Sequence, residues 1–477
     1  MTDGKRTGSG DPPGPSAPLP EGVRVTLDPG VRMIEPHLWW GGSPARLLRL
    51  TPAGYAAWQQ LRIAPVRGGA AAVLARRLTD SGFAHPRPRP RRSADLTVVV
   101  PVRDRPVPLA RCLTALGDRY PVIVVDDGSA DPASVAAVAA HHGATLLRHD
   151  RNRGPAAARN TALRRVRTEL VAFVDSDCVP GGDWIARLAG HFDDPLVAAV
   201  APRITALGPG PCGLDLGDRA ARVVPNTPVA FVPTAALLAR RGALVDIARH
   251  TAVFDPGLRF GEDVDLVWRL HEAGWRVRYD PGAVVAHEEP SSVGRVLARR
   301  FRYGTSAAPL AERHPDSLPP LAVPFWSAAT VVALLGGRPL PAAAAFTASL
   351  LSNGATLRRL GAPPRQAVRY AVASLWHTGL AIGRYSTKYC GPLLLALAVT
   401  GRGPRTGRRL AIGALLLGPA VVSATDGRVH NPMREIADDI AYGCGVWVGC
   451  LRHRTVVPLR PRLTLARRSG REVSPKD

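Results

Sequence analysis

Two carboxylates in the stretch FVDSDCVP, residues 173–180, are the side chains best suited to chemistry in this sequence. Asp175 and Asp177 follow an apolar run and stand two residues apart, so they lie on one side if the strand continues through them. Neighbouring carboxylates repel each other, and a shared divalent cation removes that penalty. Oxygen ligands of this kind suit Mg²⁺ or Mn²⁺ that also holds substrate phosphates. The pattern alone is weak, because aspartates that bond their own backbone in a turn have the same spacing.

A second acidic group, GEDVD at residues 261–265, begins a helical pattern. It contains three carboxylates, Glu262, Asp263 and Asp265, and a carboxylate of this kind could act as a general base. Acidic residues also favour helix starts for electrostatic reasons, so this group alone decides nothing. The residues that follow, LVWRL, are mainly apolar, so we expect the helix to pack inward with its acidic end at a site.

The scaffold for these carboxylates is predicted from the alternation of strand and helix patterns. Fully apolar strands that alternate with helices are typical of an α/β fold whose mostly parallel sheet is covered on both faces. Ligands bind such sheets at the carboxyl ends of the strands. The expected strands cover residues 96–102, 121–129, 144–150 and 170–177, with helices at 108–116, 134–143 and 154–166. The acidic residues at the ends of these strands are Asp104, Asp126, Asp127, Asp175 and Asp177.

Five motifs, in this order, resemble the family 2 glycosyltransferases. They are VVVPVRDR (98–105), VVDDGSADP (124–132), NRGPAAARN (152–160), FVDSDCVP (173–180) and GEDVDLVWRL (261–270). The resemblance implies the GT-A nucleotide-diphospho-sugar transferase fold, a mixed, mostly parallel sheet between helices. Within the family the chain looks most like the glycosyltransferases of mycofactocin systems. This likeness comes from VAAVAPRI (197–204), VPTAALLARR (232–241), GWRVRYDPGAVVAH (274–287) and AYGCGVWVGCLR (441–452).

The resemblance implies a reaction and its partners. A sugar would move from a nucleoside diphosphate to an acceptor hydroxyl, with inversion at the anomeric centre and one general base, Asp263. Glu262 would orient the acceptor. The implied donor is a UDP-sugar, with UDP-glucose expected, and the implied acceptor is a peptide-derived redox cofactor of the mycofactocin type. A membrane enzyme that acts on a lipid or cell-wall polysaccharide acceptor stays open as an alternative.

The resemblance also implies roles for individual residues. Asp177 would bind Mg²⁺ or Mn²⁺ directly, Asp175 would hold the ribose or complete the metal shell, and His287 is a further candidate metal ligand. Trp268 and Arg269 fall on the acceptor or diphosphate side. The residues expected on the donor nucleotide are Pro101, Arg103, Asp126, Asp127, Arg159 and Asp175. The Q-x-x-R-W signature of processive synthases is absent, which argues against extrusion of a long chain.

The net charge of +24, nearly all from arginine, suggests a phosphate-bearing partner or merely an arginine-rich proteome. DNA binding is a remote alternative, because the basic residues are dispersed, and we expect no nucleic-acid partner. The six cysteines form no CxxC pair and are expected to be reduced. Residues 1–20 contain no apolar segment typical of a signal peptide.

Residues 21–85 are expected to form a small α+β unit that resembles peptide-binding winged-helix modules. The stretch GVRVTLDPGVRMI (22–34) predicts a hairpin around its DPG turn. Helical spacing is expected over residues 43–61 and again over 71–83. A capping domain without a ligand is the alternative interpretation.

Residues 317–425 contain long uncharged stretches close to the roughly 20 apolar residues that a spanning helix needs. Membrane-embedded hairpins, an interfacial bundle and buried core helices remain alternatives, with membrane association favoured. The expected location is the cytoplasmic side of the cell membrane, or the cytoplasm. The predicted organisation is a disordered tail (1–20), the winged-helix-like unit (21–85), a Pro/Arg linker (86–95), the GT-A domain (96–310), an apolar helical region (311–455) and a basic tail (456–477).

Overall fold

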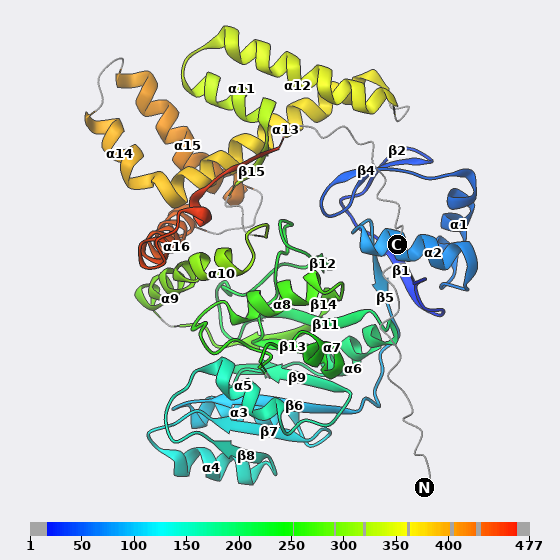
Figure 1. Cartoon of the computed structure of the whole chain (residues 1–477), viewed down its shortest axis with the longest axis vertical. Coiled ribbons are helices and arrows are strands. Elements are labelled where there is room, and N and C mark those ends of the chain that lie inside the picture. Colours follow the sequence, from blue (N-terminus) through cyan, green and yellow to red (C-terminus); the bar gives the residue numbers. More distant parts are fainter. Residues whose placement is uncertain are drawn as a thin grey trace. The chain divides into compact units, whose positions relative to one another are not determined.

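A computed structural model describes residues 17–250, 252–290, 292–317, 321–359, 363–400, 405–425 and 431–464. The chain forms two compact units, Met1–Pro290 and Ser291–Asp477 (Figure 1). The boundary that we expected after residue 310 lies inside the second unit. Most of the predicted N-terminal tail and the end of the predicted C-terminal tail lie outside the described residues.

The first unit is built around a nine-stranded sheet. Its order is β10-β14-β11-β13-β9-β6-β7-β8, and β12 pairs with β14. The strands β8, β7, β6 and β9 are mutually parallel, and β11 is parallel to β14. The antiparallel pairs are β13–β9, β11–β13, β10–β14 and β12–β14. The strands are β6 (Leu96–Val102), β7 (Val122–Asp126), β8 (Thr145–Arg148), β9 (Leu170–Val174), β10 (Cys178–Pro180), β11 (Val197–Ala206), β12 (Ala221–Val223), β13 (Ala236–Arg240) and β14 (Arg276–His287).

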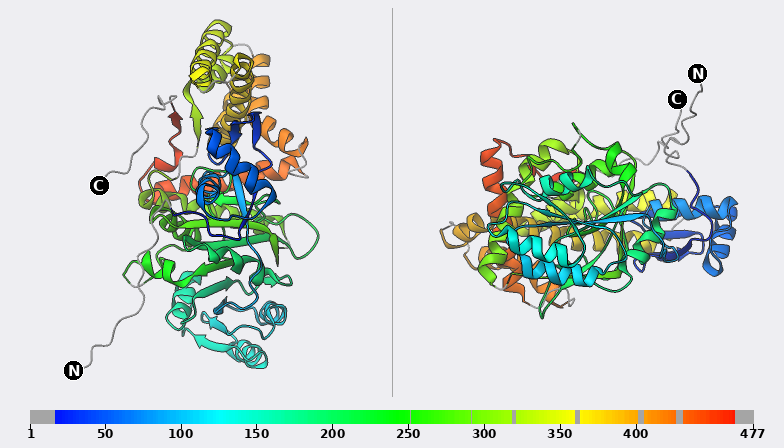
Figure 2. Two further views of the ribbon diagram at one scale, coloured as in Figure 1. Left: turned by 90° about the vertical axis from the view of Figure 1, so that its right-hand side faces the viewer. Right: turned by 90° about the horizontal axis from the view of Figure 1, so that it is seen from below.

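Helices cover both faces of this sheet, as the further views in Figure 2 also show. Alternate residues of β6, such as Val98 and Val100, pack on one face against Leu109 of α3 and Leu188 of α6. On the opposite face Phe173 makes an edge-on contact with Phe254, 5.2 Å between ring centres. The helices are α3 (Pro106–Leu116), α4 (Pro132–His141), α5 (Pro155–Leu163), α6 (Trp184–Ala189), α7 (Arg241–Asp246) and α8 (Glu262–Glu272), with a 3₁₀ turn at Gly190–Asp193.

The predicted α/β architecture is confirmed, and the ends of the elements show where residue pattern was insufficient. The strand expected over residues 170–177 ends at Val174, so Asp175 and Asp177 lie in a turn between β9 and β10. The Cys178 amide donates to the Asp175 carbonyl oxygen at 2.9 Å, which closes this turn. The two aspartates therefore leave the sheet instead of continuing it.

The N-terminal part of the first unit corrects two predictions. The DPG turn forms, since the Gly30 amide donates to Asp28 at 2.7 Å, but its flanking strands do not pair with each other. Instead β1 pairs with β5, and β2 pairs with β3, so the predicted hairpin is wrong. The helix expected over residues 43–61 begins only at Pro52, where Thr51 caps it, and the earlier part of that range contains the strand at Arg46–Arg49. The elements are β1 (Arg24–Leu27), β2 (Arg32–Glu35), β3 (Leu38–Gly41), β4 (Arg46–Arg49), α1 (Pro52–Ile63), α2 (Gly69–Asp80) and β5 (Ala84–Arg87).

Buried ion pairs join this N-terminal part to the large sheet. Arg76 of α2 makes a two-pronged pair with Asp194, at 2.7 and 2.8 Å. Arg276 at the start of β14 reaches back to Asp80 at 2.8 Å. Such planar, doubly bonded pairs fix orientation as well as distance. The two parts therefore form one unit and not two independent domains.

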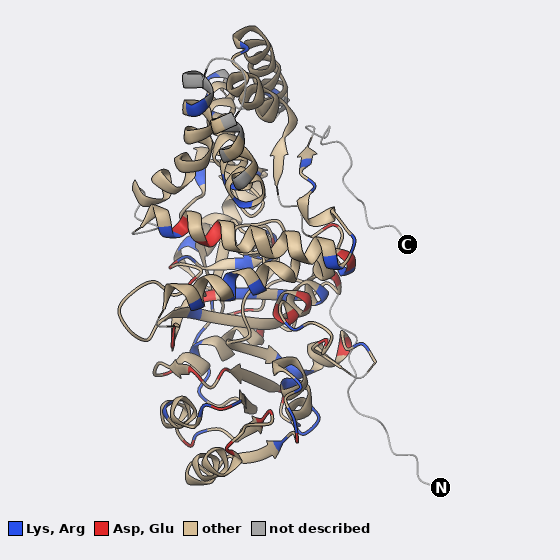
Figure 3. Cartoon of the chain, turned by 90° about the vertical axis from the view of Figure 1, so that its left-hand side faces the viewer, with Lys and Arg blue, Asp and Glu red and all other residues tan. Residues whose placement is uncertain are grey.

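The second unit consists mainly of helices, and these are mostly tan in Figure 3, that is, neither basic nor acidic. Helices α9 and α16 cross at glycines: a Cβ on Gly445 would lie 2.0 Å from the Phe301 carbonyl oxygen. No helix among the described residues is both long and apolar enough to cross a membrane. The elements are α9 (Val293–Thr305), α10 (Ala307–Arg313), β15 (Ala322–Pro324), α11 (Phe325–Leu335), α12 (Pro339–Arg359), α13 (Pro364–Tyr385), a π turn (Ser386–Cys390), α14 (Gly391–Thr400), α15 (Arg405–Thr425), α16 (Pro432–Arg452), a 3₁₀ turn (Val457–Leu459) and β16 (Arg462–Thr464).

Candidate active site

The loops that follow β6 and β7 are fastened to each other at the edge of the sheet. Asp104, with a positive φ of 55°, accepts from the Ala130 amide at 2.7 Å, and its own amide donates to Ser129. Asp126 accepts from the Ser129 amide at 2.9 Å. Asp126 is fully buried, and its second oxygen has an ion pair with Arg148 at 3.5 Å but no hydrogen bond among the described residues. The expected nucleotide-binding loops thus form one connected surface.

Asp127 fixes the start of helix α5. Its two oxygens accept from the amides of Arg153 and Gly154, at 2.9 and 2.7 Å. The Nδ1 atom of His149 lies 2.7 Å from the same carboxylate. A helix start favours an anion, and in this structure the anion is the Asp127 carboxylate. Any contact of Asp127 with a nucleobase has to use a remaining lone pair.

Arg159 lies in the interior and connects the carboxylates of two motifs. Its side chain, 2% exposed, donates to Asp175 at 2.7 Å and to Glu262 at 2.9 Å. The guanidinium also lies over the ring of Phe254, 5.6 Å from its centre. A buried cation between two carboxylates sets the separation of the elements that carry them. Arg159 therefore brings the β9–β10 turn and the start of α8 together.

Strand pairing brings His287 to Asp177 from the far end of the domain. In the β10–β14 pair, Cys178 lies opposite His287, and β10 begins directly after Asp177. The Glu288 amide donates to the Asp177 carbonyl oxygen at 3.0 Å. As a result the Nε2 atom of His287 lies 3.7 Å from an Asp177 carboxylate oxygen. The other Asp177 oxygen pairs with the exposed guanidinium of Arg105.

The positive charge near the Asp177 carboxylate is not enough to offset its burial and the neighbouring Asp175. Burial and the neighbouring Asp175 raise the pKa of Asp177, and His287 and Arg105 offset this only in part. Burial acts to lower the pKa of His287, but Glu289 and Asp177 outweigh it and raise that pKa. A divalent cation would relieve the charge on the two aspartates. Two carboxylates and one imidazole are donors that fit such a cation.

Asp263 stands at the start of helix α8, next to the carboxylate that Arg159 holds. Burial, followed by the charge of Glu262, raises the pKa of Asp263 to about 7. One Asp263 oxygen accepts from the Val264 amide at 2.8 Å. A carboxylate with a pKa close to neutral pH can take up a proton during a reaction and release it afterwards.

The structure separates the remaining expected site residues. Pro101 is buried in β6, whereas Arg103 is exposed and its Nε lies 3.3 Å from Asp104. Trp268 is buried and donates to the Ala230 carbonyl oxygen at 2.9 Å.

Arg269 is also buried and donates to Asp265 at 2.8 Å and to two backbone carbonyl oxygens. These protein partners speak against the contacts with acceptor or diphosphate that we expected of Trp268 and Arg269. Both side chains instead hold helix α8 in the core.

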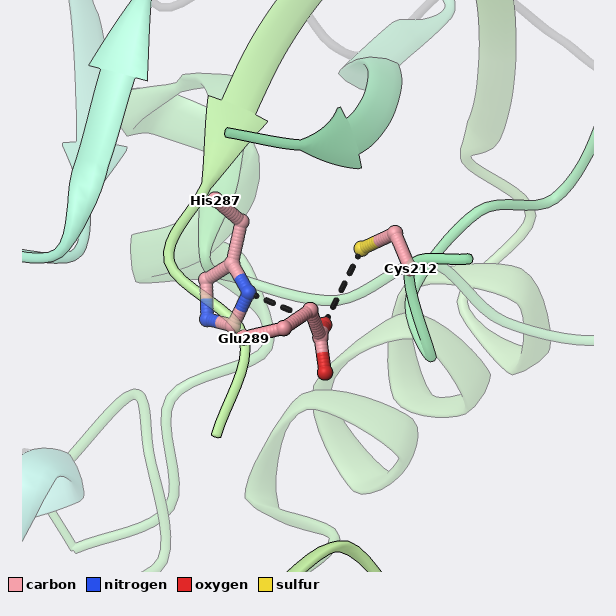
Figure 4. A group of neighbouring side chains, drawn as sticks. All are labelled: Cys212, His287 and Glu289. Carbon is pink, nitrogen blue, oxygen red and sulfur yellow. Dashed lines mark hydrogen bonds and ion pairs between the residues drawn. The ribbon is translucent and has the colours of Figure 1, made fainter. Parts of the chain in front are cut away.

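Three side chains at the site were missed by the sequence reasoning. Arg105 pairs with Asp177, and its place beside Arg103 in the motif VVVPVRDR was the available signal. Glu289 accepts from His287 at 3.1 Å and from Cys212 at 3.2 Å (Figure 4). Burial raises the pKa of the Cys212 thiol to about 12. The spacing of Glu289, two residues after His287, was a signal, whereas nothing local indicated Cys212.

Comparison with known proteins matches these features to one family. Residues 97–211 match the family described as glycosyl transferase family 2. The pre-mycofactocin glycosyltransferase of Mycobacterium tuberculosis is 39% identical over 93% of this chain and 98% of its own length. The chain therefore belongs to the family 2 glycosyltransferases, which are nucleotide-sugar-dependent enzymes, and it is similar over nearly its whole length to the pre-mycofactocin glycosyltransferases.

Other relatives match a smaller part of the chain. Succinoglycan biosynthesis protein ExoU of Rhizobium meliloti is 30% identical and covers 39% of this chain and 59% of its own. Among solved structures, a mannosyltransferase from Pyrobaculum calidifontis in complex with GDP-Man and Mn²⁺ covers 76% of this chain and 89% of its own. Its identity is 20% and its TM-score is 0.44.

Proposed function

We propose that the chain transfers a glucosyl group from UDP-glucose to a hydroxyl of a peptide-derived mycofactocin precursor, with inversion at the anomeric carbon. The observation that carries this proposal is the position of Arg159, which bonds to both Asp175 and Glu262. It joins the expected donor motif to the motif that contains the expected base. The near full-length similarity to pre-mycofactocin glycosyltransferase supports this choice of acceptor.

A divalent cation, Mg²⁺ or Mn²⁺, would be held by Asp177, with Asp175 and His287 completing the set of donors. The 3.7 Å between His287 Nε2 and Asp177, together with the raised pKa of Asp177, supports this assignment. When bound, such a cation neutralises charge that develops on a departing diphosphate. A cation on Asp177 would displace the ion pair with Arg105, whose guanidinium would then be available to contact the diphosphate.

Asp263 is the proposed general base. As the acceptor oxygen attacks the anomeric carbon, its proton passes to the Asp263 carboxylate, and the bond to the diphosphate oxygen breaks on the opposite face. The pKa of about 7 makes Asp263 basic enough to accept this proton at neutral pH. Glu262, held by Arg159, keeps the helix start in place and is proposed to orient the acceptor.

The nucleoside is proposed to lie along the loops after β6 and β7. Pro101 and Arg103 would border it, and the base N–H would find an acceptor in Asp126 or Asp127. The buried Asp126 oxygen, which has no hydrogen bond within the part of the chain that the structure describes, supports this side of the site. Asp127 acts in addition through the start of α5, since two amides there donate to it.

A lipid or cell-wall acceptor at a membrane surface is the second candidate. Large apolar side chains exposed on the second unit favour it, among them Trp326, Leu340, Leu351 and Trp376. In this case the enzyme would work at the cytoplasmic face of the membrane. Co-sedimentation of the full chain with anionic vesicles, set against neutral vesicles, separates this proposal from a freely diffusing enzyme.

The test is incubation of the full chain with UDP-glucose, UDP-N-acetylglucosamine or GDP-mannose and with Mn²⁺, Mg²⁺ or a chelator. We expect release of UDP from UDP-glucose only with a cation present, and faster release when the mycofactocin precursor is added. Release of GDP alone would overturn the proposed donor. Stimulation by a lipid extract but not by the precursor would overturn the proposed acceptor.

A further inference from the structure

Three side chains next to the proposed donor site offer ligand atoms for a soft divalent cation. Cys212, His287 and Glu289 each contribute one such atom, and the three atoms lie within 4.8 Å of one another. They come from two segments, the loop after β11 and the end of β14. Figure 4 shows the imidazole of His287 and the thiol of Cys212 both directed at the Glu289 carboxylate.

The separations approach those of a tetrahedral zinc site. Glu289 Oε1 lies 3.1 Å from His287 Nδ1 and 3.2 Å from Cys212 Sγ. Zinc bonds of about 2.0–2.3 Å at tetrahedral angles put neighbouring ligand atoms roughly 3.4 Å apart. Two of the three separations therefore need to change by only a few tenths of an ångström. The third, between sulfur and nitrogen, is no more than 4.8 Å.

Backbone amides around these ligands prepare them for a cation. The Gly213 amide donates to Glu289 at 3.2 Å, and the Leu214 amide donates to the Cys212 sulfur at 3.4 Å. The Leu214 amide orients the sulfur but offsets only part of the burial that disfavours the thiolate, so the cation itself has to displace the thiol proton. Hydrogen bonds of this kind to ligating groups orient them and tune the metal.

We propose that Cys212, His287 and Glu289 form a zinc site beside the donor site, with the fourth position left to water. Zn²⁺ replaces the Cys212 thiol proton, which passes to solvent. It also takes the Nδ1 lone pair of His287, so the proton that Nδ1 donates to Glu289 leaves that atom and the imidazole keeps one proton. The remaining proton of the imidazole then sits on Nε2, facing Asp177. His287 in this form has no lone pair for the cation that holds the donor.

Zinc at this site is therefore an inhibitor of cation-dependent sugar transfer. This consequence rests on the proposed function, because it uses the role assigned to His287 at the donor cation. The site itself does not depend on that role. Occupancy and inhibition are accordingly measured in separate experiments.

Occupancy is tested with Co²⁺, which replaces Zn²⁺ and absorbs in the near ultraviolet when bonded to sulfur. We expect the full chain, without nucleotide sugar, to show this absorption at one equivalent of Co²⁺. Cys212→Ser should lose the absorption and bind Co²⁺ at least about tenfold more weakly, since even indirect contacts are worth 10–100-fold. Glu289→Gln should keep the absorption with weaker affinity. Cys444→Ser, which changes an exposed cysteine of the second unit, is the matched control and should behave as the original chain.

Equal absorption in Cys212→Ser, or none in the original chain, would overturn the zinc site. Inhibition is tested by titrating Zn²⁺ into Mn²⁺-dependent donor hydrolysis, where Cys212→Ser should need at least about tenfold more zinc. Equal inhibition of both proteins would overturn the coupling to His287. If no donor is hydrolysed while the absorption still follows Cys212, the proposed function fails and the zinc site stands.

Discussion

The acidic site of the first unit and the crossing of helices α9 and α16 in the second bring distant segments together in opposite ways. At the site, Arg159 bonds to carboxylates from two motifs, and strand pairing sets His287 beside Asp177. At the helix crossing a glycine without a side chain, Gly445, lies directly against the Phe301 backbone.

Both regions belong to sequence stretches that supported the family resemblance. One packs two helices together, whereas the other gathers charged side chains. A close approach of backbones needs only the absence of a Cβ, and glycine supplies it. A set of partly buried carboxylates costs folding free energy, and that cost is expected where the charges are used. Shared motifs alone therefore do not distinguish residues that act on a substrate from residues that pack helices.

The largest effect is expected from Asp263→Asn. The amide cannot accept the acceptor proton, so the transfer rate should fall about 10²–10⁴-fold while binding of UDP-glucose is retained. Steady-state kinetics and calorimetric titration of the donor measure the two quantities. Turnover at the original rate would refute Asp263 as the base.

Replacement of Arg159, whose guanidinium connects Asp175 and Glu262, should reduce both the stability of the fold and the activity. Arg159→Met leaves Asp175 and Glu262 without their shared partner, which for a buried pair costs about 3–5 kcal/mol in the free energy of unfolding. Denaturant unfolding of the full chain measures it. Arg151→Met, which changes an exposed arginine, is the control and should unfold as the original chain does. Equal stability of the two variants would show that Arg159 does not join the motifs.

The pH dependence of transfer should show the raised pKa of Asp263. Because only the ionised carboxylate is a base, kcat/KM should fall about tenfold per pH unit below pH 7 and level off above it. A plateau that extends down to pH 5 contradicts this expectation.

The raised pKa of Asp263 should make folding stability fall with rising pH, whereas the transfer rate should increase with rising pH. Folding favours the protonated form of Asp263. The stability that this carboxyl group contributes is therefore present at acidic pH and is lost as the pH rises through 7. Asp263→Asn should therefore be more stable than the original chain at pH 8 and equal to it near pH 4. Thermal unfolding at the two pH values measures the difference, and a variant less stable at pH 8 would contradict it.

The smallest effects should come from the helix crossing. Gly445→Ala places a methyl group against the Phe301 carbonyl and should destabilise the second unit by about 1–3 kcal/mol. Gly379→Ala, in α13 with no atom within 4 Å of the added methyl, should stabilise it by about 0.5–1 kcal/mol. Thermal unfolding of both variants measures the contrast. Effects of the same sign would mean that α9 and α16 do not need their close approach.

The sequence predicted the half of the sheet that is made from consecutive units. Strand β6 was predicted over its exact range, because a fully apolar run between charges has few alternatives. The hairpin around DPG failed for the converse reason. Its turn chemistry is local and formed as expected, whereas the partner of β1 is β5, which lies far along the chain.

The site shows the same limit. Asp175, Asp177 and Asp263 were predicted from their motifs, but the contacts of Arg159 were not, since a single sequence does not reveal which carboxylates a buried guanidinium reaches. Trp268 and Arg269 were assigned to the acceptor or diphosphate side from the family resemblance, which does not show which way each side chain points. One helical turn separates a residue that faces the site from one that faces the core, and Arg269 bonds to Asp265 on the inner side.

The register that sets Cys178 opposite His287 has a consequence for biosynthesis. The segments that it joins lie more than a hundred residues apart, and contacts between such distant positions form slowly. A nascent chain released before β14 is made contains the aspartates of FVDSD without their histidine. We expect such a fragment to bind neither Mn²⁺ nor UDP-glucose, so the ability to hold a donor arises only after nearly the whole first unit has left the ribosome.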